Sequence, residues 1–195
     1  MEIYVANTSY IHYLRKFDSN VMINDEDGRT RKYVGIIYKI NSFNYFVPLS
    51  SPKLNKDYII VNEKWVVRKS VVPIHRMIIR HGNSVDFLGK LLFSNMIPIP
   101  DSEVTLLDIN GIADEKYKNL LNKQVIYIRK HREQLQKKHA QVIYKQKTSN
   151  FSNIGYLNST VDFKLLEQKM LEYLAAKEIV EGKEQASADK EEWQL

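Results

Sequence analysis

The sequence predicts an α+β fold, in which helices from the second half of the chain pack against a curved antiparallel sheet from the first half. Two patterns predict it. Short β-rich runs separated by Gly, Asn and Ser fill residues 33–93, whereas apolar residues recur at helical spacing after Asp114. With 195 residues, of which 44% are hydrophobic and 11% aromatic, the chain can bury a sizeable core, and wholesale disorder is excluded.

The strands are expected mostly before residue 94. Residues 2–6 ("EIYVA") form a short strand, and Asn7 or Thr8 caps the helix that follows. Residues 33–40 and 44–49 are β-rich runs joined by Asn-Ser-Phe, which is a hairpin signal. Further strands are predicted over 57–61, 65–72, 76–80 and 87–93, and the prolines of "SNMIPIP" favour an extended segment.

Two helices are expected in the second half. A long amphipathic helix begins after Asp114, and its outer face is strongly basic as far as Lys147. After the irregular stretch "KTSNFSNIGYLNS", Asp162 caps a second helix, which is expected to end at Gly182. We therefore expect one domain over residues 1–182 and a flexible acidic tail over residues 183–195.

Basic residues are clustered rather than spread evenly. The net charge is +6, although residues 177–195 hold three Lys against six acids. Between Lys64 and Lys90 there are six basic residues against one acid, and residues 115–147 hold ten against two. Such clusters favour a polyanionic partner, of which nucleic acid is the commonest, over the simpler explanation of solubility.

Several classes of protein are excluded or disfavoured. The chain has no cysteine, and its five histidines show no metal-binding spacing, so we expect no metal site and no cofactor. A pair of histidines acting as acid and base stays open, although a solvated surface is favoured for them. There is no GxSxG elbow and no phosphate loop. Because no apolar run spans a membrane and no signal peptide is seen, a soluble cytoplasmic protein with no membrane partner is expected.

The stretch "YFVPLSSPK" (residues 45–53) begins as a buried strand and ends in two hydroxyls and an ammonium. Pro52 fixes its own φ and pushes Ser51 into an extended conformation, so Ser50, Ser51 and Lys53 can converge on one anion. Pairing across the hairpin brings Arg31, just before the partner strand, to the end of this strand. A phosphate site is therefore one interpretation, and a solvated turn is the other.

RNA would supply its own nucleophile to such a site, the 2′-hydroxyl. Arg31 cannot act as a base, so it would stabilise the charge on the phosphorane oxygens. Lys53 would be a base only if its pKa were lowered, and otherwise a stabiliser or proton donor. Ser50 and Ser51 would hold the scissile phosphate.

Five segments in order give the chain a family resemblance: "YIHYLRKFDSNV", "RKYVGIIYKINSFNYFVPLSSPK", "SNMIPIP" followed by "EVTLLDIN", "YKNLLNKQ" and "DFKLLEQKMLEYL". From about residue 3 to 173 it resembles the ToxN/AbiQ family of type III toxin–antitoxin toxins. The resemblance implies a metal-independent endoribonuclease with a twisted antiparallel sheet partly wrapped by helices, like MazF and Kid, leaving 2′,3′-cyclic phosphate and 5′-hydroxyl ends.

The resemblance also implies partners. The toxin would process and be inhibited by a repeated pseudoknot antitoxin RNA in a closed toxin–RNA assembly, and on phage infection would cut cellular and phage transcripts, giving abortive infection.

The family's active-site Ser/Thr-Ser-Pro-Lys falls on Ser50, Ser51, Pro52 and Lys53, and its upstream basic residue on Arg31. Some relatives carry Lys at the upstream position, and Arg31 there shifts any proton transfer to Lys53 or to the RNA itself. Some relatives also carry a Tyr where this chain has Arg29, so any role of that Tyr does not transfer. The remaining residues expected to bind RNA lie beside the site or on the basic tracts: Arg29, Lys32, Tyr33, Lys56, Arg68, Lys69, Arg76, Arg80, Lys118, Lys123 and Arg129. The alternatives are a non-catalytic RNA-binding module and a small hydrolase with a Ser–Lys dyad.

Overall fold

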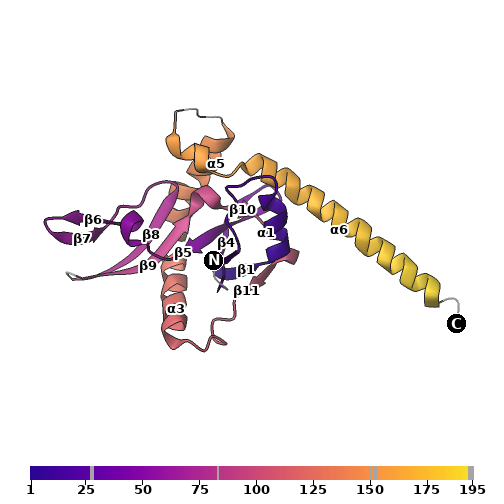
Figure 1. The fold of residues 1–195 in the computed structure, drawn as a ribbon, viewed down its shortest axis with the longest axis horizontal. Coiled ribbons are helices and arrows are strands. Elements are labelled where there is room, and N and C mark those ends of the chain that lie inside the picture. The colour runs from indigo at the N-terminus through magenta and orange to yellow at the C-terminus, as the bar shows by residue number, and fades with distance from the viewer. Residues whose placement is uncertain (27–28, 83, 150, 152, 193–195) are drawn as a thin grey trace.

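The computed structural model describes residues 1–26, 29–82, 84–149, 151 and 153–192. Within these residues a seven-stranded sheet has the order β11-β1-β4-β5-β9-β8, with β10 also paired to β5, and all its pairings are antiparallel. Its strands are β1 (Glu2–Ala6), β4 (Lys32–Ile40), β5 (Phe43–Ser50), β8 (Ile74–His81), β9 (Ser84–Leu92), β10 (Ile97–Pro98) and β11 (Val104–Leu106). The predicted α+β class and antiparallel sheet are confirmed (Figure 1).

The predicted hairpin is formed by β4 and β5. Asn41 makes the turn with a φ of 51°, a conformation that Asn tolerates better than most residues. The register pairs Tyr33 with Pro48 and Tyr38 with Tyr45, with a shift between Val34 and Tyr38. The start of β4 therefore lies beside the end of β5, as the sequence predicted.

Strand β5 is central and mostly buried. One edge of β5 pairs with β4. The other edge pairs with β10 near the start of β5 and with β9 at its end, where Ser50 lies opposite Lys90. Gly89 on β9 has a φ of +124°, and a Cβ there would lie 3.1 Å from the carbonyl oxygen of Ser50. A side chain at residue 89 would thus be strained and would crowd the end of β5.

Two pairs of short strands stand apart from this sheet. One pair is β2 (Asp25–Glu26) with β3 (Arg29–Thr30), and the other is β6 (Tyr58–Val61) with β7 (Lys64–Val67). The second pair forms an arm that projects from the body and exposes Ile60 and Trp65 (Figure 1). The strand predicted over 65–72 ends at Val67, because Lys69 and Ser70 turn to hydrogen-bond Arg76.

The basic helix begins as predicted but is not continuous. Asp114 caps α3 (Glu115–Lys130), accepting from the backbone N–H groups of Lys116 and Tyr117 at 2.9 and 3.1 Å. After His131 the chain continues through α4 (Arg132–Gln134), the π-helical turn η3 (Leu135–Ala140) and α5 (Gln141–Thr148). Helix α3 packs on β1 and β9, and η3 packs on β4 and β8. The lesser helices are α1 (Thr8–Arg15), capped by Asn7, η1 (Phe93–Asn95), η2 (Asp101–Glu103) and η4 (Gly155–Ser159).

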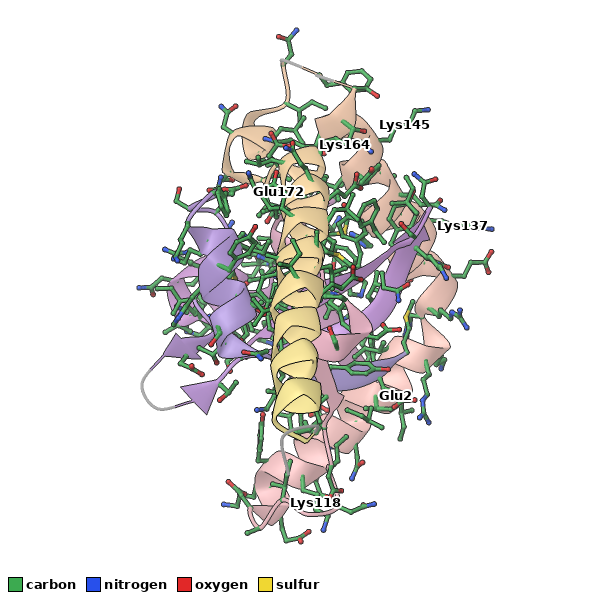
Figure 2. The ribbon with its side chains drawn as sticks, turned by 90° about the vertical axis from the view of Figure 1, so that its right-hand side faces the viewer. Glu2, Lys118, Lys137, Lys145, Lys164 and Glu172 are labelled. Atoms are coloured by element: carbon green, nitrogen blue, oxygen red, sulfur yellow. The ribbon has the colours of Figure 1, made fainter. Side chains whose placement is uncertain are left out.

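The last helix, α6 (Phe163–Glu192), is capped by Asp162, as expected. Its buried Glu167 accepts hydrogen bonds from the hydroxyls of Tyr45 and Tyr144 at 2.8 and 2.7 Å, which fixes the start of α6 to β5 and α5. The expected end at Gly182 is wrong, because one glycine costs only about 1 kcal/mol relative to alanine and strong helix formers flank it. The second half of α6 extends away from the sheet (Figures 1 and 2). Among the described residues, no helix is long and apolar enough to cross a membrane.

A buried chain of hydrogen bonds joins two histidines that were expected on a solvated surface. His139 Nδ1 lies 3.0 Å from the carbonyl oxygen of Val72, which can only accept, so this nitrogen carries the proton. His139 Nε2 then accepts from His75 Nδ1 at 3.0 Å, and His75 Nε2 accepts from the Tyr127 hydroxyl at 3.0 Å. Both histidines are neutral in this arrangement. Burial and the neighbouring His139 lower the pKa of His75 to about 3, and burial lowers the pKa of His139.

Acid is therefore expected to destabilise the fold through these histidines. Unfolded His75 takes up a proton near pH 6.5 whereas the folded residue does not, so its contribution is complete above pH 6.5 and declines as the pH falls towards 3. At pH 5 the loss from His75 alone is about 2 kcal/mol. Urea unfolding between pH 7.5 and 5 measures this loss in the free energy of unfolding. The control is His12→Gln, which removes an exposed histidine and should leave the loss unchanged. A free energy of unfolding that stays constant over this range would contradict the assignment.

Candidate active site

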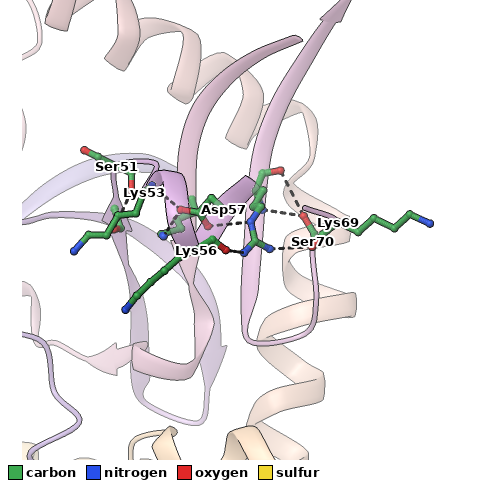
Figure 3. A network of polar contacts seen from close by, with 9 residues as sticks. Ser51, Lys53, Lys56, Asp57, Lys69 and Ser70 are labelled. Atoms are coloured by element: carbon green, nitrogen blue, oxygen red, sulfur yellow. Dashed lines mark hydrogen bonds and ion pairs between the residues drawn. The ribbon is translucent and has the colours of Figure 1, made fainter. Parts of the chain in front are cut away.

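The Ser-Ser-Pro-Lys segment forms a loop at the end of β5. Ser50 ends the strand and is half-buried, whereas Ser51, Pro52 and Lys53 leave the sheet and are exposed. The short helix α2 (Leu54–Asp57) follows at once. Ser50 Oγ donates a long hydrogen bond, 3.4 Å, to the carbonyl oxygen of Ser51. Ser51 and Lys53 thus lie on one exposed loop at the margin of the sheet, directly after Ser50 (Figure 3).

Arg31 lies beside this loop, as the sequence predicted. Its backbone N–H donates to the carbonyl oxygen of Asn24 at 2.7 Å, and its Nε donates to that of Ile23 at 2.8 Å. Its Nη1 lies 3.4 Å from the carbonyl oxygen of Leu49, the residue before Ser50. The guanidinium is therefore held by two segments at the end of β5, at the residue that precedes the two serines, and its charge is permanent.

A buried carboxylate under the loop was missed by sequence reasoning. Asp57 is fully buried, and its Oδ2 accepts from the backbone N–H of Lys53 at 2.8 Å and from Lys90 Nζ at 2.5 Å. Its Oδ1 accepts from Arg76 Nε at 3.0 Å. Burial alone would raise the pKa of Asp57, but the hydrogen bonds and charges of these partners outweigh it and lower the pKa. The one available signal was that Asp57 is the only acid between Ser50 and Asn62.

Two of the residues expected to bind RNA are buried instead. Arg76 is 7% exposed because it serves Asp57, and Tyr33 is 1% exposed because it lies in the core beneath the sheet. Burial also raises the pKa of the Tyr33 hydroxyl. Neither side chain is available to a phosphate or a base, so both predictions are wrong. The basic cluster of residues 64–90 loses Lys90 to the interior for the same reason.

The other predicted RNA contacts lie nearer the surface. Those with exposed side chains are Lys56, Arg68, Lys69, Arg80, Lys123 and Arg129. Lys123 and Arg129 make surface ion pairs with Asp86 and Glu2, and the half-buried Lys118 pairs with Glu115. Lys32 is half-buried, and burial lowers its pKa. The side chain of Arg29 lies outside the described part of the structure.

Figure 2 shows how the basic residues of the helices are distributed. Lys118, Lys137 and Lys145 are spread from one end of the α3–α5 column to the other. They therefore form an extended basic surface along these helices. Among the described residues, no group of three or more His, Asp or Glu is placed to hold a metal ion.

The fold and the site define a class: a compact α+β protein with an exposed Ser-Ser-Pro-Lys loop and a fixed arginine at one sheet margin, flanked by basic surfaces that suit a polyanion. The family described as "Toxin ToxN, type III toxin-antitoxin system" matches residues 2–171. The chain belongs to this family, and the resemblance seen in the sequence is confirmed.

Individual relatives are similar over almost their whole length. Endoribonuclease AbiQ of Lactococcus lactis subsp. lactis is 37% identical over 173 residues, which is 89% of either chain. A solved structure of AbiQ, a lactococcal anti-phage endoribonuclease of a type III system, has a TM-score of 0.71 at 31% identity and covers 89% of this chain and 98% of that one. Another solved structure, from work on selective toxin inhibition by a non-coding RNA pseudoknot, has a TM-score of 0.71 at 31% identity. It covers 88% of this chain and 96% of that one.

Proposed function

We propose that this protein is the endoribonuclease toxin of a type III toxin–antitoxin system and acts in abortive phage infection. The observation that carries the proposal is that Arg31 Nη1 lies 3.4 Å from the carbonyl oxygen of Leu49, next to the loop that bears Ser50, Ser51 and Lys53, in a family whose relatives include proteins named endoribonucleases. Cleavage would occur in the cytoplasm on cellular and phage transcripts, without a metal ion.

The proposed reaction uses the substrate's own 2′-hydroxyl. Its oxygen attacks the adjacent phosphorus, the bond from phosphorus to the 5′-oxygen breaks, and the products carry a 2′,3′-cyclic phosphate and a 5′-hydroxyl. Ser50 and Ser51 donate hydrogen bonds to the non-bridging oxygens, and the Arg31 guanidinium stabilises the charge that builds on them. Lys53 protonates the departing 5′-oxygen, and the 2′-hydroxyl proton passes to water.

The proposed natural inhibitor is a repeated RNA pseudoknot, which the toxin would cut from its precursor and hold in a closed heteromeric assembly. The relative whose structure concerns a non-coding RNA pseudoknot supports this choice of partner. The exposed cations Lys56, Arg68 and Lys69 would contact phosphates near the loop. Trp65, which is 56% exposed on the arm, would stack an unpaired base. A MazF-like and Kid-like sheet, and a single catalytic domain over residues 1–182, are part of the same proposal.

Cleavage of a transcript by the purified protein in EDTA tests the function. We expect cleavage to persist in the chelator and the upstream fragment to end in a cyclic phosphate, which resists phosphatase until acid opens it. A non-catalytic RNA-binding module would bind the same RNA and yield no fragments. A hydrolase with a Ser–Lys dyad would instead be labelled at Ser51 by an acylating probe. Loss of cleavage in EDTA would overturn the metal-independent mechanism.

A further inference from the structure

We infer that Asp57, together with Lys90 and Arg76, is the positioning unit that sets the conformation of the Ser50–Lys53 loop. The inference rests on the proposed function for its catalytic consequence, but its structural part stands on the contacts alone. Asp57 is fully buried, as few carboxylates are, and each of its two oxygens accepts at least one hydrogen bond from a cation or from the loop backbone (Figure 3).

The backbone of Lys53 is held on both sides by the same residue. Its N–H donates to Asp57 Oδ2 at 2.8 Å, and its carbonyl oxygen accepts from the backbone N–H of Asp57 at 2.8 Å. Pro52 has no N–H, so Lys53 carries the first backbone donor after the two serines. Fixing the peptide groups of Lys53 therefore fixes where the exposed part of the loop rejoins the body.

The other end of the loop is held by Lys90. In the sheet Ser50 pairs with Lys90, and Lys90 pairs in turn with Arg76 on β8. The Lys90 side chain reaches Asp57 Oδ2 at 2.5 Å. The loop is thereby closed into a ring: strand pairing ties Ser50 to Lys90, and the carboxylate ties Lys90 to Lys53. One end of the four-residue segment that bears the proposed catalytic groups therefore contacts the buried carboxylate directly, through Lys53, and the other end is linked to it through Lys90.

Arg76 extends the same support to the base of the arm. Its Nη1 donates to the carbonyl oxygen of Lys69 at 2.9 Å, and its Nη2 lies 3.4 Å from that of Lys56. The carbonyl oxygen of Asp57 accepts from the backbone N–H of Arg68 at 2.8 Å. The backbone of the loop and of the exposed cations Lys56, Arg68 and Lys69 is thus hydrogen-bonded to Asp57 and Arg76. Breaking the Asp57–Arg76 contact would therefore displace the loop and these cations together.

The test compares Asp57→Asn with Glu167→Gln. Both change a buried carboxylate into its isosteric amide. Asp57 accepts from two side chains and one backbone N–H, and Glu167, on α6, accepts from three side chains, those of Tyr45, Tyr144 and Lys164. Two readouts are made on the full chain at temperatures where both variants are folded: hydrogen exchange of the peptide containing Lys53, and kcat and KM for RNA cleavage.

We expect Asp57→Asn to speed exchange at the loop by about tenfold and to lower kcat by about 100-fold with a smaller change in KM. Glu167→Gln should lower the melting temperature but leave loop exchange and kcat at wild-type values. Unchanged loop exchange in Asp57→Asn would overturn the positioning role. Faster loop exchange in Asp57→Asn with an unchanged kcat would show that the positioning role has no consequence for catalysis. Wild-type protein that cuts no RNA would refute the proposed function, while the exchange result would still decide the positioning role.

Discussion

Ser51→Ala is expected to abolish most RNA cleavage while leaving the fold intact. Ser51 is exposed in the loop, so its hydroxyl contributes little to folding. In the proposed reaction it donates to an oxygen whose charge grows in the transition state, and removing one such donor typically lowers kcat by about 100- to 1,000-fold. Single-turnover cleavage of a labelled transcript measures the effect.

The control for this prediction is Ser42→Ala. Ser42 is also an exposed serine, but it lies in the β4–β5 turn, at the opposite end of β5 from Ser51. It should cleave at the wild-type rate, and both variants should bind RNA with wild-type affinity. A Ser51→Ala protein that cleaves as fast as Ser42→Ala would remove Ser51 from the site.

The proposed site could be placed from sequence because it depends on local pairing. The hairpin signal at Asn41 fixes β4 against β5, and this alone brings Arg31 to the end of the strand that carries Ser50. Prolines 48 and 52 then mark where the strand and loop are stiffened. Each of these inferences spans fewer than about 20 residues, within which turn chemistry and strand period determine the geometry.

The support under the site could not be placed in this way. Asp57 lies 19 residues from Arg76 and 33 from Lys90, and only the pairing of β8 with β9 and of β9 with β5 brings them together. From sequence, Arg76 and Lys90 were counted as surface cations, since charged residues are rarely buried unless paired. His75 and His139 were misjudged for the same reason, because their contact joins β8 to η3 across 64 residues.

The positive charge of the chain therefore has two separate uses. Arg76 and Lys90 balance one buried carboxylate and hold the loop from within, whereas Lys56, Arg68 and Lys69 remain outside for a polyanion. A count of basic residues does not separate these uses, but burial does. Neutralising an outer cation is expected to weaken RNA binding, whereas neutralising an inner one disturbs the loop.

Arg31→Gln is expected to lower kcat by about 100- to 1,000-fold with little change in KM, because in the proposed reaction the guanidinium stabilises charge that appears only in the transition state. Arg31→Lys should recover part of the rate, since it keeps the charge but loses the planar fork that donates to the carbonyl oxygens of Ile23 and Leu49. The pH–rate profile should keep its shape in Arg31→Gln, because a guanidinium does not titrate in the range that a protein tolerates.

Arg15→Gln is the matched control, because Arg15 also holds a loop by donating to two carbonyl oxygens, those of Ser19 and Val21, at a place with no proposed chemistry. It should cost stability and leave kcat unchanged. If Arg15→Gln slowed cleavage as much as Arg31→Gln, the effect of Arg31 would be structural. If Arg31→Gln removed one limb of the pH–rate profile, Arg31 would be setting the pKa of the group that moves the proton. The proposed roles, charge stabilisation by Arg31 and proton donation by Lys53, would then be wrong.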